Sequence, residues 1–217
     1  MMQNESMRRE RLVRDLAGKG IRERGVLDAI RRVPRELFVQ EALRGEAYRD
    51  ASLPIGEHQT ISQPWIVARM TELAQPDGKG KVLEIGTGSG YHAAVLSHVF
   101  ELVYSVERIQ ALSIRARQTL RDLGVQNVHL KIFDGSYGWS EFAPYRAILV
   151  TAAAPSIPTP LVDQLEDGGR LIIPIGPADG GADQVLTRFT RKGNDVAQEE
   201  HGLCRFVPLV GRFGWNG

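Results

Sequence analysis

The stretch KVLEIGTGSGYHAAVL, residues 81–96, joins an apolar run to a second apolar segment through a turn with three glycines. KVLEI predicts a buried strand, and YHAAVLSHVF predicts the helix that follows it. Gly86, Gly88 and Gly90 allow a tight turn whose backbone N–H groups can face a ligand. A dinucleotide fingerprint would have glycine at Tyr91, and a P-loop would need a GK pair followed by Ser or Thr, which is missing. The turn alone does not identify the ligand.

The chain from residue 81 onward alternates strands with helices. LVYSVE, VHLKIFD, RAILVTA and GRLIIPIG predict strands, whereas IQALSIRARQTLRDLG and PTPLVDQL predict helices. QVLTRFTR and CRFVPLV, separated by KGND, predict a terminal antiparallel pair of strands. This alternation predicts an α/β fold, with a doubly wound and mostly parallel sheet covered by helices on both faces. Ligands bind such sheets at the carboxyl ends of the strands.

The N-terminal part has a different pattern. Residues 7–45 show the apolar spacing of short amphipathic helices, interrupted at Gly18–Gly20 and at Pro34. Arginines are frequent here but alternate with acidic residues, which favours solvated helix faces over a nucleic-acid arm. We expect the 217 residues to form one domain, with a helical and substrate-loop region at 1–75 and a Rossmann-like core at 76–217.

Composition narrows the class of protein further. The formal net charge of +1 argues against general polyanion binding, and 42% hydrophobic residues suffice for a substantial core. The single cysteine, Cys204, cannot form an internal disulfide and is expected to be a small core residue. No apolar run approaches the roughly 20 residues that span a bilayer. We expect a cytoplasmic monomer that binds neither membrane nor nucleic acid.

Acidic residues end the two strands that follow the glycine turn. Glu107 ends LVYSVE, where a carboxylate can accept both ribose hydroxyls, and Asp134 ends VHLKIFD, where it can accept an adenine amino hydrogen. Together with the turn, they indicate one adenosine lying across three strand tips. An adenosine without a pyrophosphate needs no glycine at Tyr91, which favours S-adenosyl-L-methionine, with Glu84 ordering its methionine end. The sequence therefore predicts a methyltransferase.

The methyl acceptor is less evident from the residues. The strand that runs into LVTAAAPSIP lacks the Asn/Asp-Pro-Pro-aromatic loop typical of enzymes that methylate amino groups. In LPIGEHQTISQPWIVARMTEL, residues 53–73, Pro64 begins an apolar helix. Ser62 is then either the N-cap of that helix or a hydroxyl that binds an anion at its start. The scattered histidines suggest no metal site.

Several segments in unbroken order resemble bacterial protein-L-isoaspartate O-methyltransferases. They are LPIGEHQTISQPWIVARMTEL, VLEIGTGSGYHAAVL, YSVERI, VTAAAPSIP, LEDGGRLIIPIG and RFVPLV. The resemblance implies a seven-stranded methyltransferase sheet with its last two strands exchanged in order. It also implies methylation of the free carboxyl of L-isoaspartyl residues in damaged proteins and peptides, which starts their repair.

The resemblance also implies site residues. Ser62 matches the active-site serine of the family. Residues implied to bind the cofactor are Gln59, Thr60, Ile61, Glu84, Gly86, Gly88, Ser89, Gly90, Glu107, Arg108, Asp134 and Gly135. Residues implied to bind the peptide are Thr60, Ile61, Ser62, Val207, Pro208 and Leu209.

The chain departs from the family pattern at two places. Phe133 stands where a glycine is common, which could reshape the adenine pocket, and Glu57–His58 replaces a pair that often contains glycine. Two other functions stay open. One is methylation of RNA or a small molecule, which the arginine-rich start would favour. The other is non-catalytic cofactor binding, which Phe133 would favour if its ring filled the adenine site.

Methylation of an isoaspartyl carboxyl needs no catalytic base. An isoaspartyl carboxylate has a pKa of about 4 and is already ionised at neutral pH. Ser62 would then orient this carboxylate through its hydroxyl rather than act as a nucleophile.

Overall fold

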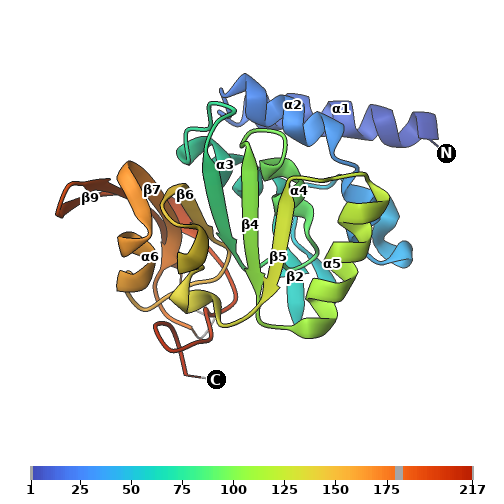
Figure 1. Cartoon of the computed structure of the whole chain (residues 1–217). Helices are drawn as coiled ribbons and strands as arrows, with labels where there is room; N and C mark the ends of the chain where they lie inside the picture. Colours follow the sequence, from blue (N-terminus) through green and yellow to red (C-terminus); the bar gives the residue numbers. More distant parts are fainter. Residues whose placement is uncertain (1, 179–182, 217) are drawn as a thin grey trace.

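A seven-stranded sheet runs through the centre of the structure, a computed structural model that describes residues 2–178 and 183–216 (Figure 1). Its strand order is β5-β4-β3-β6-β7-β8-β9. The strands are β3 (Lys81–Ile85), β4 (Leu102–Glu107), β5 (Val128–Ile132), β6 (Tyr145–Val150), β7 (Leu165–Ile175), β8 (Gln184–Lys192) and β9 (Asp195–Cys204). Pairs from β5 to β7 are parallel, whereas β8 is antiparallel to both of its neighbours. The last three strands lie side by side in the order of the sequence, with β9 at the edge.

The helices precede and connect these strands. They are α1 (Met2–Gly18), α2 (Arg24–Arg32), α3 (Pro64–Leu73), α4 (Tyr91–Leu96), α5 (Gln110–Asp122) and α6 (Thr159–Asp163). Single 3-10 turns are η1 (Arg35–Phe38), η2 (Glu41–Glu46), η3 (Gly135–Tyr137) and η4 (Ser140–Phe142). A hairpin of β1 (Leu53–Gly56) and β2 (Gln59–Ile61) precedes α3. Within the described residues, none of the helices combines the length and apolar character needed to cross a membrane.

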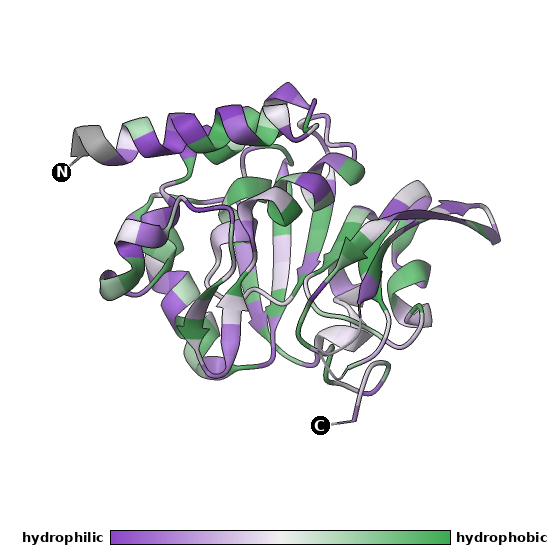
Figure 2. Cartoon of the chain, turned by 180° about the vertical axis from the view of Figure 1, so that it is seen from behind, coloured by the Kyte–Doolittle hydropathy of each residue, from purple (hydrophilic) through white to green (hydrophobic). Residues whose placement is uncertain are grey.

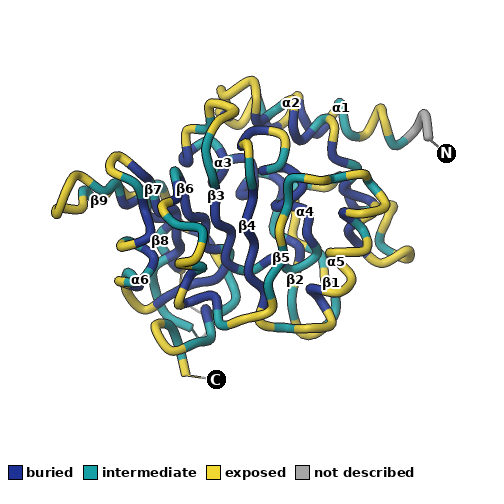
Figure 3. The backbone as a smooth tube through the Cα atoms, viewed as in Figure 1, coloured by how far each residue is buried: buried dark blue, intermediate teal, exposed yellow. Residues whose placement is uncertain are grey.

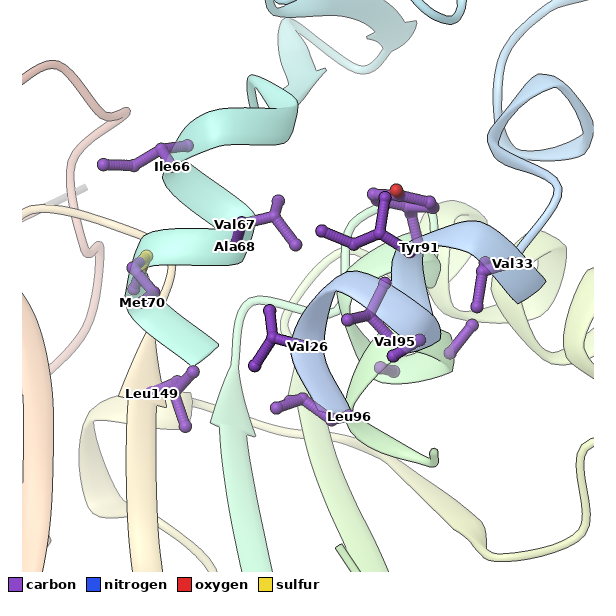
Figure 4. Close-up of a cluster of buried hydrophobic side chains, with 14 of the residues drawn as sticks. Val26, Val33, Ile66, Val67, Ala68, Met70, Tyr91, Val95, Leu96 and Leu149 are labelled. Carbon is purple, nitrogen blue, oxygen red and sulfur yellow. The ribbon is translucent and has the colours of Figure 1, made fainter. Parts of the chain in front are cut away.

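Alternating side chains of the sheet enter two separate cores. Val82, Val103 and Leu149 pack with the helices from α1 to α5, whereas Leu83 and Ile148 pack on the other face with α6 and the η4 turn. The first core is the larger one, and Figure 4 shows side chains of α2, α3 and α4 meeting within it. Strands β3 and β4 are buried along most of their length (Figure 3). The predicted doubly wound sheet is confirmed, with unequal cover on its two faces.

The N-terminus of α3 is capped from outside its own segment. The N-cap residue is Gln63, whose side chain makes no capping bond. Asp50 Oδ1 instead accepts a hydrogen bond of 2.8 Å from the backbone N–H of Trp65, while Asp50 Oδ2 pairs with Lys19 of the α1–α2 connection. The interpretation of Ser62 as an N-cap is therefore wrong, because a carboxylate distant in sequence occupies that role.

The predicted terminal antiparallel pair is confirmed, but its second strand was placed too far along the chain. CRFVPLV was expected to pair with β8, but the partner of β8 is the preceding segment Asp195–Cys204. This hairpin extends away from the rest of the molecule and is largely hydrophilic toward its tip (Figure 2). Its strand β9 is mostly exposed, so the sequence carries no alternation of apolar and polar residues to reveal it. Pro208 instead forms an isolated parallel bridge with Ala153, beside the end of β6.

Removal of the distant cap should destabilise the fold. Asp50→Ala is expected to lower the free energy of unfolding by about 0.5–2 kcal/mol, the usual cost of a lost N-cap. Urea unfolding of wild type and variant measures this difference. Lys19→Met removes only the half-exposed ion pair and should cost less. Asp195→Ala, at an exposed position of β9, is the matched control. Equal stability of Asp50→Ala and wild type would contradict the capping role.

Candidate functional site

A cavity of about 810 Å³, open to solvent, lies at the carboxyl ends of β3, β4 and β6. Its lining includes every residue that the sequence implied for the cofactor except Gly90 and Asp134, and every residue implied for the peptide. The further lining residues are Ile85, Thr87, Val67, Tyr91, His92, Val106, Ile109, Leu112, Thr151, Ala152 and Val210. The fold thus brings the glycine turn, the loop after β2 and the segment after β9 around one space.

The glycine turn is shaped by its contact with the end of β6. Gly86 has a φ of 97°, and a Cβ atom there would collide with Thr151 Oγ1. The Thr151 hydroxyl lies 2.7 Å from the carbonyl oxygen of Gly86, to which it donates. Gly90 has a φ of 89° and directly precedes α4. Sequence reasoning missed Thr151, because only the parallel pairing of β3 with β6 places it beside the turn.

Glu107 connects two turns at this edge of the sheet. Its side chain is buried, with Oε2 accepting from the backbone N–H of Gly88 at 2.8 Å and Oε1 accepting from that of Ile109 at 2.9 Å. Each carboxylate oxygen has a second lone pair. The carboxylate can therefore fix the glycine turn and still accept hydrogen bonds from two hydroxyls of a ligand.

Glu84 is a fully buried acid in the cavity wall. Its Oε2 accepts from the Ser105 hydroxyl, which also bonds Thr87 Oγ1, while Oε1 has no partner among the described residues. Burial raises the pKa of Glu84 to about 8; the nearby charge of Glu107 also raises it, and the Ser105 bond lowers it. A buried carboxyl with an unused oxygen would be stabilised by a ligand that brings a positive charge.

Asp134 lies beside the cavity rather than in its wall. Its Oδ1 accepts from the backbone N–H and hydroxyl of Ser136, and its Oδ2 accepts from the backbone N–H of Arg212 at 2.9 Å. The neighbouring Gly135 does line the cavity. The carboxylate therefore anchors the C-terminal turn at the end of β5, through a contact between distant residues that no local sequence pattern indicates.

Phe133 does not occupy the cavity. Its ring is 44% exposed and lies outside the lining residues, with Lys131 Nζ 4.7 Å from the ring centroid. Phe133 therefore does not fill the cavity, which removes the observation that would have favoured a non-catalytic module.

The hairpin of β1 and β2, which precedes Ser62, has a tight turn. Glu57 and His58 have φ values of 53° and 54°, a left-handed conformation that is costly for residues with a Cβ atom. Arg115 of α5 donates to the Ile55 carbonyl oxygen at 2.9 Å and so fastens the hairpin to the core. The substitution of the glycine-containing pair thus does not prevent the turn.

Ser62 lies where this cavity meets a second one. The second cavity, of about 1500 Å³ and also open, has walls that include Trp65, Leu203 and Phe206. Both cavities share five lining residues, namely Thr60, Ser62, Thr151, Val207 and Pro208. Within the described residues, the Ser62 hydroxyl makes no hydrogen bond to protein. It is thus a free donor at the junction of the two spaces.

Fold and cavity together define the class of Rossmann-like, S-adenosylmethionine-dependent methyltransferases. The sheet order, the glycine turn without a pyrophosphate fingerprint and the carboxylates at the strand ends all agree with that class. Residues 7–214 match the family described as protein-L-isoaspartate(D-aspartate) O-methyltransferase. The chain belongs to this family. In the described part of the chain, no group of three or more His, Cys, Asp or Glu residues could hold a metal ion.

Individual relatives agree with the family assignment. The chain is 51% identical to a protein-L-isoaspartate O-methyltransferase 2 of Geotalea uraniireducens over 218 residues, covering 100% of this chain and 99% of the relative. A solved protein-L-isoaspartate O-methyltransferase superposes with a TM-score of 0.86 at 33% identity, covering 95% of this chain and 67% of the other. A Plasmodium falciparum structure, described as a complex with S-adenosyl-L-homocysteine, is 24% identical with a TM-score of 0.77 over 93% of this chain and 98% of the other, and shows the same fold.

The buried Glu84 should make stability depend on pH in a defined way. Because its pKa is raised from 4.5 to about 8, the folded state binds the proton more tightly than the unfolded state, so this group destabilises the fold as pH rises through that range. Glu84→Gln removes the ionisable carboxyl and with it this destabilisation at high pH. The melting temperature of Glu84→Gln relative to wild type should therefore increase from pH 5 to pH 8.

Calorimetric melting curves across this pH range measure that difference. Glu200→Gln, on the exposed edge strand, is the control and should follow wild type at each pH. A constant difference between Glu84→Gln and wild type would mean that the Glu84 carboxyl is not desolvated.

Proposed function

We propose that this chain transfers the methyl group of S-adenosyl-L-methionine to the free carboxyl of L-isoaspartyl residues in damaged proteins and peptides, which starts their repair. The observation that carries the proposal is the junction at Ser62 between the cavity at the strand ends and a second groove, in a member of this methyltransferase family. A cofactor in the first space and a peptide in the second would meet at this residue.

The residues around the first cavity suit the cofactor. We assign the ribose hydroxyls to Glu107, and the methionine end to the part of the cavity that Glu84 lines. The adenine then lies toward Gly135, with Asp134 shaping that end through the C-terminal turn rather than by direct contact. The backbone of Gly86, Gly88 and Ser89 allows close approach of the ligand. When bound, the cofactor supplies an electrophilic methyl group on a sulfonium.

The residues at the junction have only to orient the acceptor. The isoaspartyl carboxylate is ionised at neutral pH, since its pKa is about 4, and no proton has to be removed. The Ser62 hydroxyl donates a hydrogen bond to one carboxylate oxygen and directs the other toward the methyl group. Such orientation can contribute on the order of 7–11 kcal/mol to a reaction between bound partners. Withdrawal from water further favours a step in which opposite charges neutralise each other.

The peptide is proposed to lie along the segment that follows β9. Val207 accepts from Ala153 N–H, and Leu209 donates to Ala153 O, each at 2.8 Å, so this segment is held extended across the end of β6. Val207 and Pro208 line both cavities, whereas Leu209 lines only the first. Recognition through an extended backbone would tolerate many flanking sequences, which suits an enzyme that meets damage in different proteins.

We further propose a monomer and a single domain. The larger core joins the N-terminal helices to the sheet, which supports the single domain. For the alternative RNA substrate, some arginines of the N-terminal part are already paired with carboxylates of the same region. Arg9 pairs with Glu36, and Arg31 pairs with both Glu10 and Asp28. A cytoplasmic location and the absence of a nucleic-acid partner remain part of the proposal.

The proposal can be tested with paired peptides. Incubation with methyl-labelled S-adenosyl-L-methionine should transfer label to peptides that contain L-isoaspartate and not to the matched aspartyl peptides. Isoaspartyl peptides with widely different flanking residues should all be labelled. Labelling of RNA without labelling of peptide would overturn the proposal.

Substitution of Ser62 should affect turnover much more than stability. Because Asp50 caps α3, Ser62→Ala should keep the melting temperature of wild type. Loss of a hydrogen bond to a charged group costs about 1.5–3 kcal/mol, so kcat/KM for the isoaspartyl peptide should fall about 10- to 150-fold. Affinity for S-adenosyl-L-homocysteine, measured by calorimetry, should stay the same. Ser62→Thr retains the hydroxyl but adds a methyl group at the junction, and should also be impaired. Full activity of both variants would exclude Ser62 from the reaction.

A further inference from the structure

Two residues that line the cofactor cavity each have a buried hydrogen-bonding atom without a partner among the described residues. Among the described residues, seven buried side-chain nitrogen or oxygen atoms lack a hydrogen bond. Two of them, Glu84 Oε1 and His92 Nδ1, belong to residues that line this cavity. Buried polar atoms are nearly always paired, so an unpaired one on a residue that lines a cavity points to a ligand group as its partner.

The hydrogen bonds around His92 determine which of its nitrogens carries the proton. Thr71 donates its hydroxyl hydrogen to the carbonyl oxygen of Val67 at 2.8 Å, one turn earlier in α3. The same hydroxyl lies 2.9 Å from His92 Nε2 and can only accept there. Nε2 of His92 therefore carries the hydrogen, and Nδ1 has a free lone pair.

His92 remains neutral at physiological pH. The side chain is 6% exposed, and burial lowers its pKa to about 3. Its Nδ1 is therefore an acceptor throughout the pH range in which the protein would work. Glu84 Oε1, the second unpaired atom, accepts hydrogen bonds when the carboxyl is ionised.

We propose that His92 is a positioning residue whose Nδ1 accepts a hydrogen bond from the α-ammonium of the cofactor's methionine part, next to the Glu84 carboxylate. This inference rests on the proposed cofactor. The ribose hydroxyls are assigned to Glu107, the cofactor carboxylate has no hydrogen to donate, and the sulfonium has no N–H. The ammonium brings three N–H donors and a positive charge, which two buried acceptors, one of them a carboxylate, would match.

The inference distinguishes two ligands that share the same adenosine. S-adenosyl-L-homocysteine contains the ammonium, whereas 5′-deoxy-5′-methylthioadenosine lacks the whole amino-acid part. His92→Leu is expected to weaken the binding of S-adenosyl-L-homocysteine at least about tenfold, the loss of one hydrogen bond to a charged group. The same variant should bind 5′-deoxy-5′-methylthioadenosine as wild type does. Isothermal calorimetry of the full chain with each ligand measures both affinities.

Three further variants separate positioning from a general effect on the fold. His92→Asn places an amide oxygen near the position of Nδ1 and should bind S-adenosyl-L-homocysteine within about threefold of wild type, although the Thr71 bond is lost. Glu107→Gln should weaken both ligands alike, since both contain the ribose. His98→Leu, on the same connection but lining a different hollow, should change neither affinity.

Two results would overturn the inference. One is an equal loss of affinity for both ligands in His92→Leu, which would mean that His92 only supports the fold. The other is a tenfold loss of affinity for S-adenosyl-L-homocysteine in His92→Asn, although its amide oxygen can accept a hydrogen bond. Failure of wild type to bind either ligand is a different result, because it would refute the proposed cofactor itself.

Discussion

The close approach of the end of β6 to the turn after β3 is the constraint on which the site depends. Gly86 can lie against Thr151 only because it has no side chain, and its left-handed conformation turns the chain toward α4. The carboxylate of Glu107 then fixes Gly88 from the neighbouring strand. These contacts hold the backbone of the turn against the end of β6, in the wall of the cavity.

The same cavity is costly to the fold. Glu84 and His92 each bury a polar atom that has no partner among the described residues, and burial disfavours the charged form of both groups. Buried acceptors that lack donors destabilise a protein by about 1–3 kcal/mol each. A ligand that brings donors to these atoms would recover part of that energy. Stability and ligand binding are thus linked through the same few side chains.

The N-terminal region contains the hairpin and the helix on either side of Ser62, both held by side chains outside them. Asp50 caps α3, and Arg115 holds the hairpin that leads to Ser62. The buried Arg35 guanidinium lies over the ring of Tyr91, 4.8 Å from its centroid, and so links this region to the start of α4. The residues before the first strand of the sheet are therefore part of the site's framework, and the larger core is continuous from α1 to the sheet.

Local patterns in the sequence determined the class of fold and several residues that line the first cavity. The alternation of apolar strands with amphipathic helices required a mostly parallel sheet, and a parallel sheet brings the carboxyl ends of its strands to one edge. The glycine turn, Glu84 and Glu107 therefore had to lie close together. The resemblance added Ser62 and the segment Val207–Leu209, which share the same cavity.

Only the tertiary structure decided the features that depend on contacts between distant residues. The strand β9 is an exposed edge whose composition resembles a loop, so its pairing with β8 could not be read from periodicity. Asp50, and not Ser62, caps α3. The carboxylate of Asp134 accepts a hydrogen bond from the backbone of Arg212. The hydroxyl of Thr71, 21 residues away, contacts Nε2 of His92 and so leaves Nδ1 as the free acceptor. Hydrogen bonds of this kind depend on how the elements pack, and a sequence read in short windows does not contain that information.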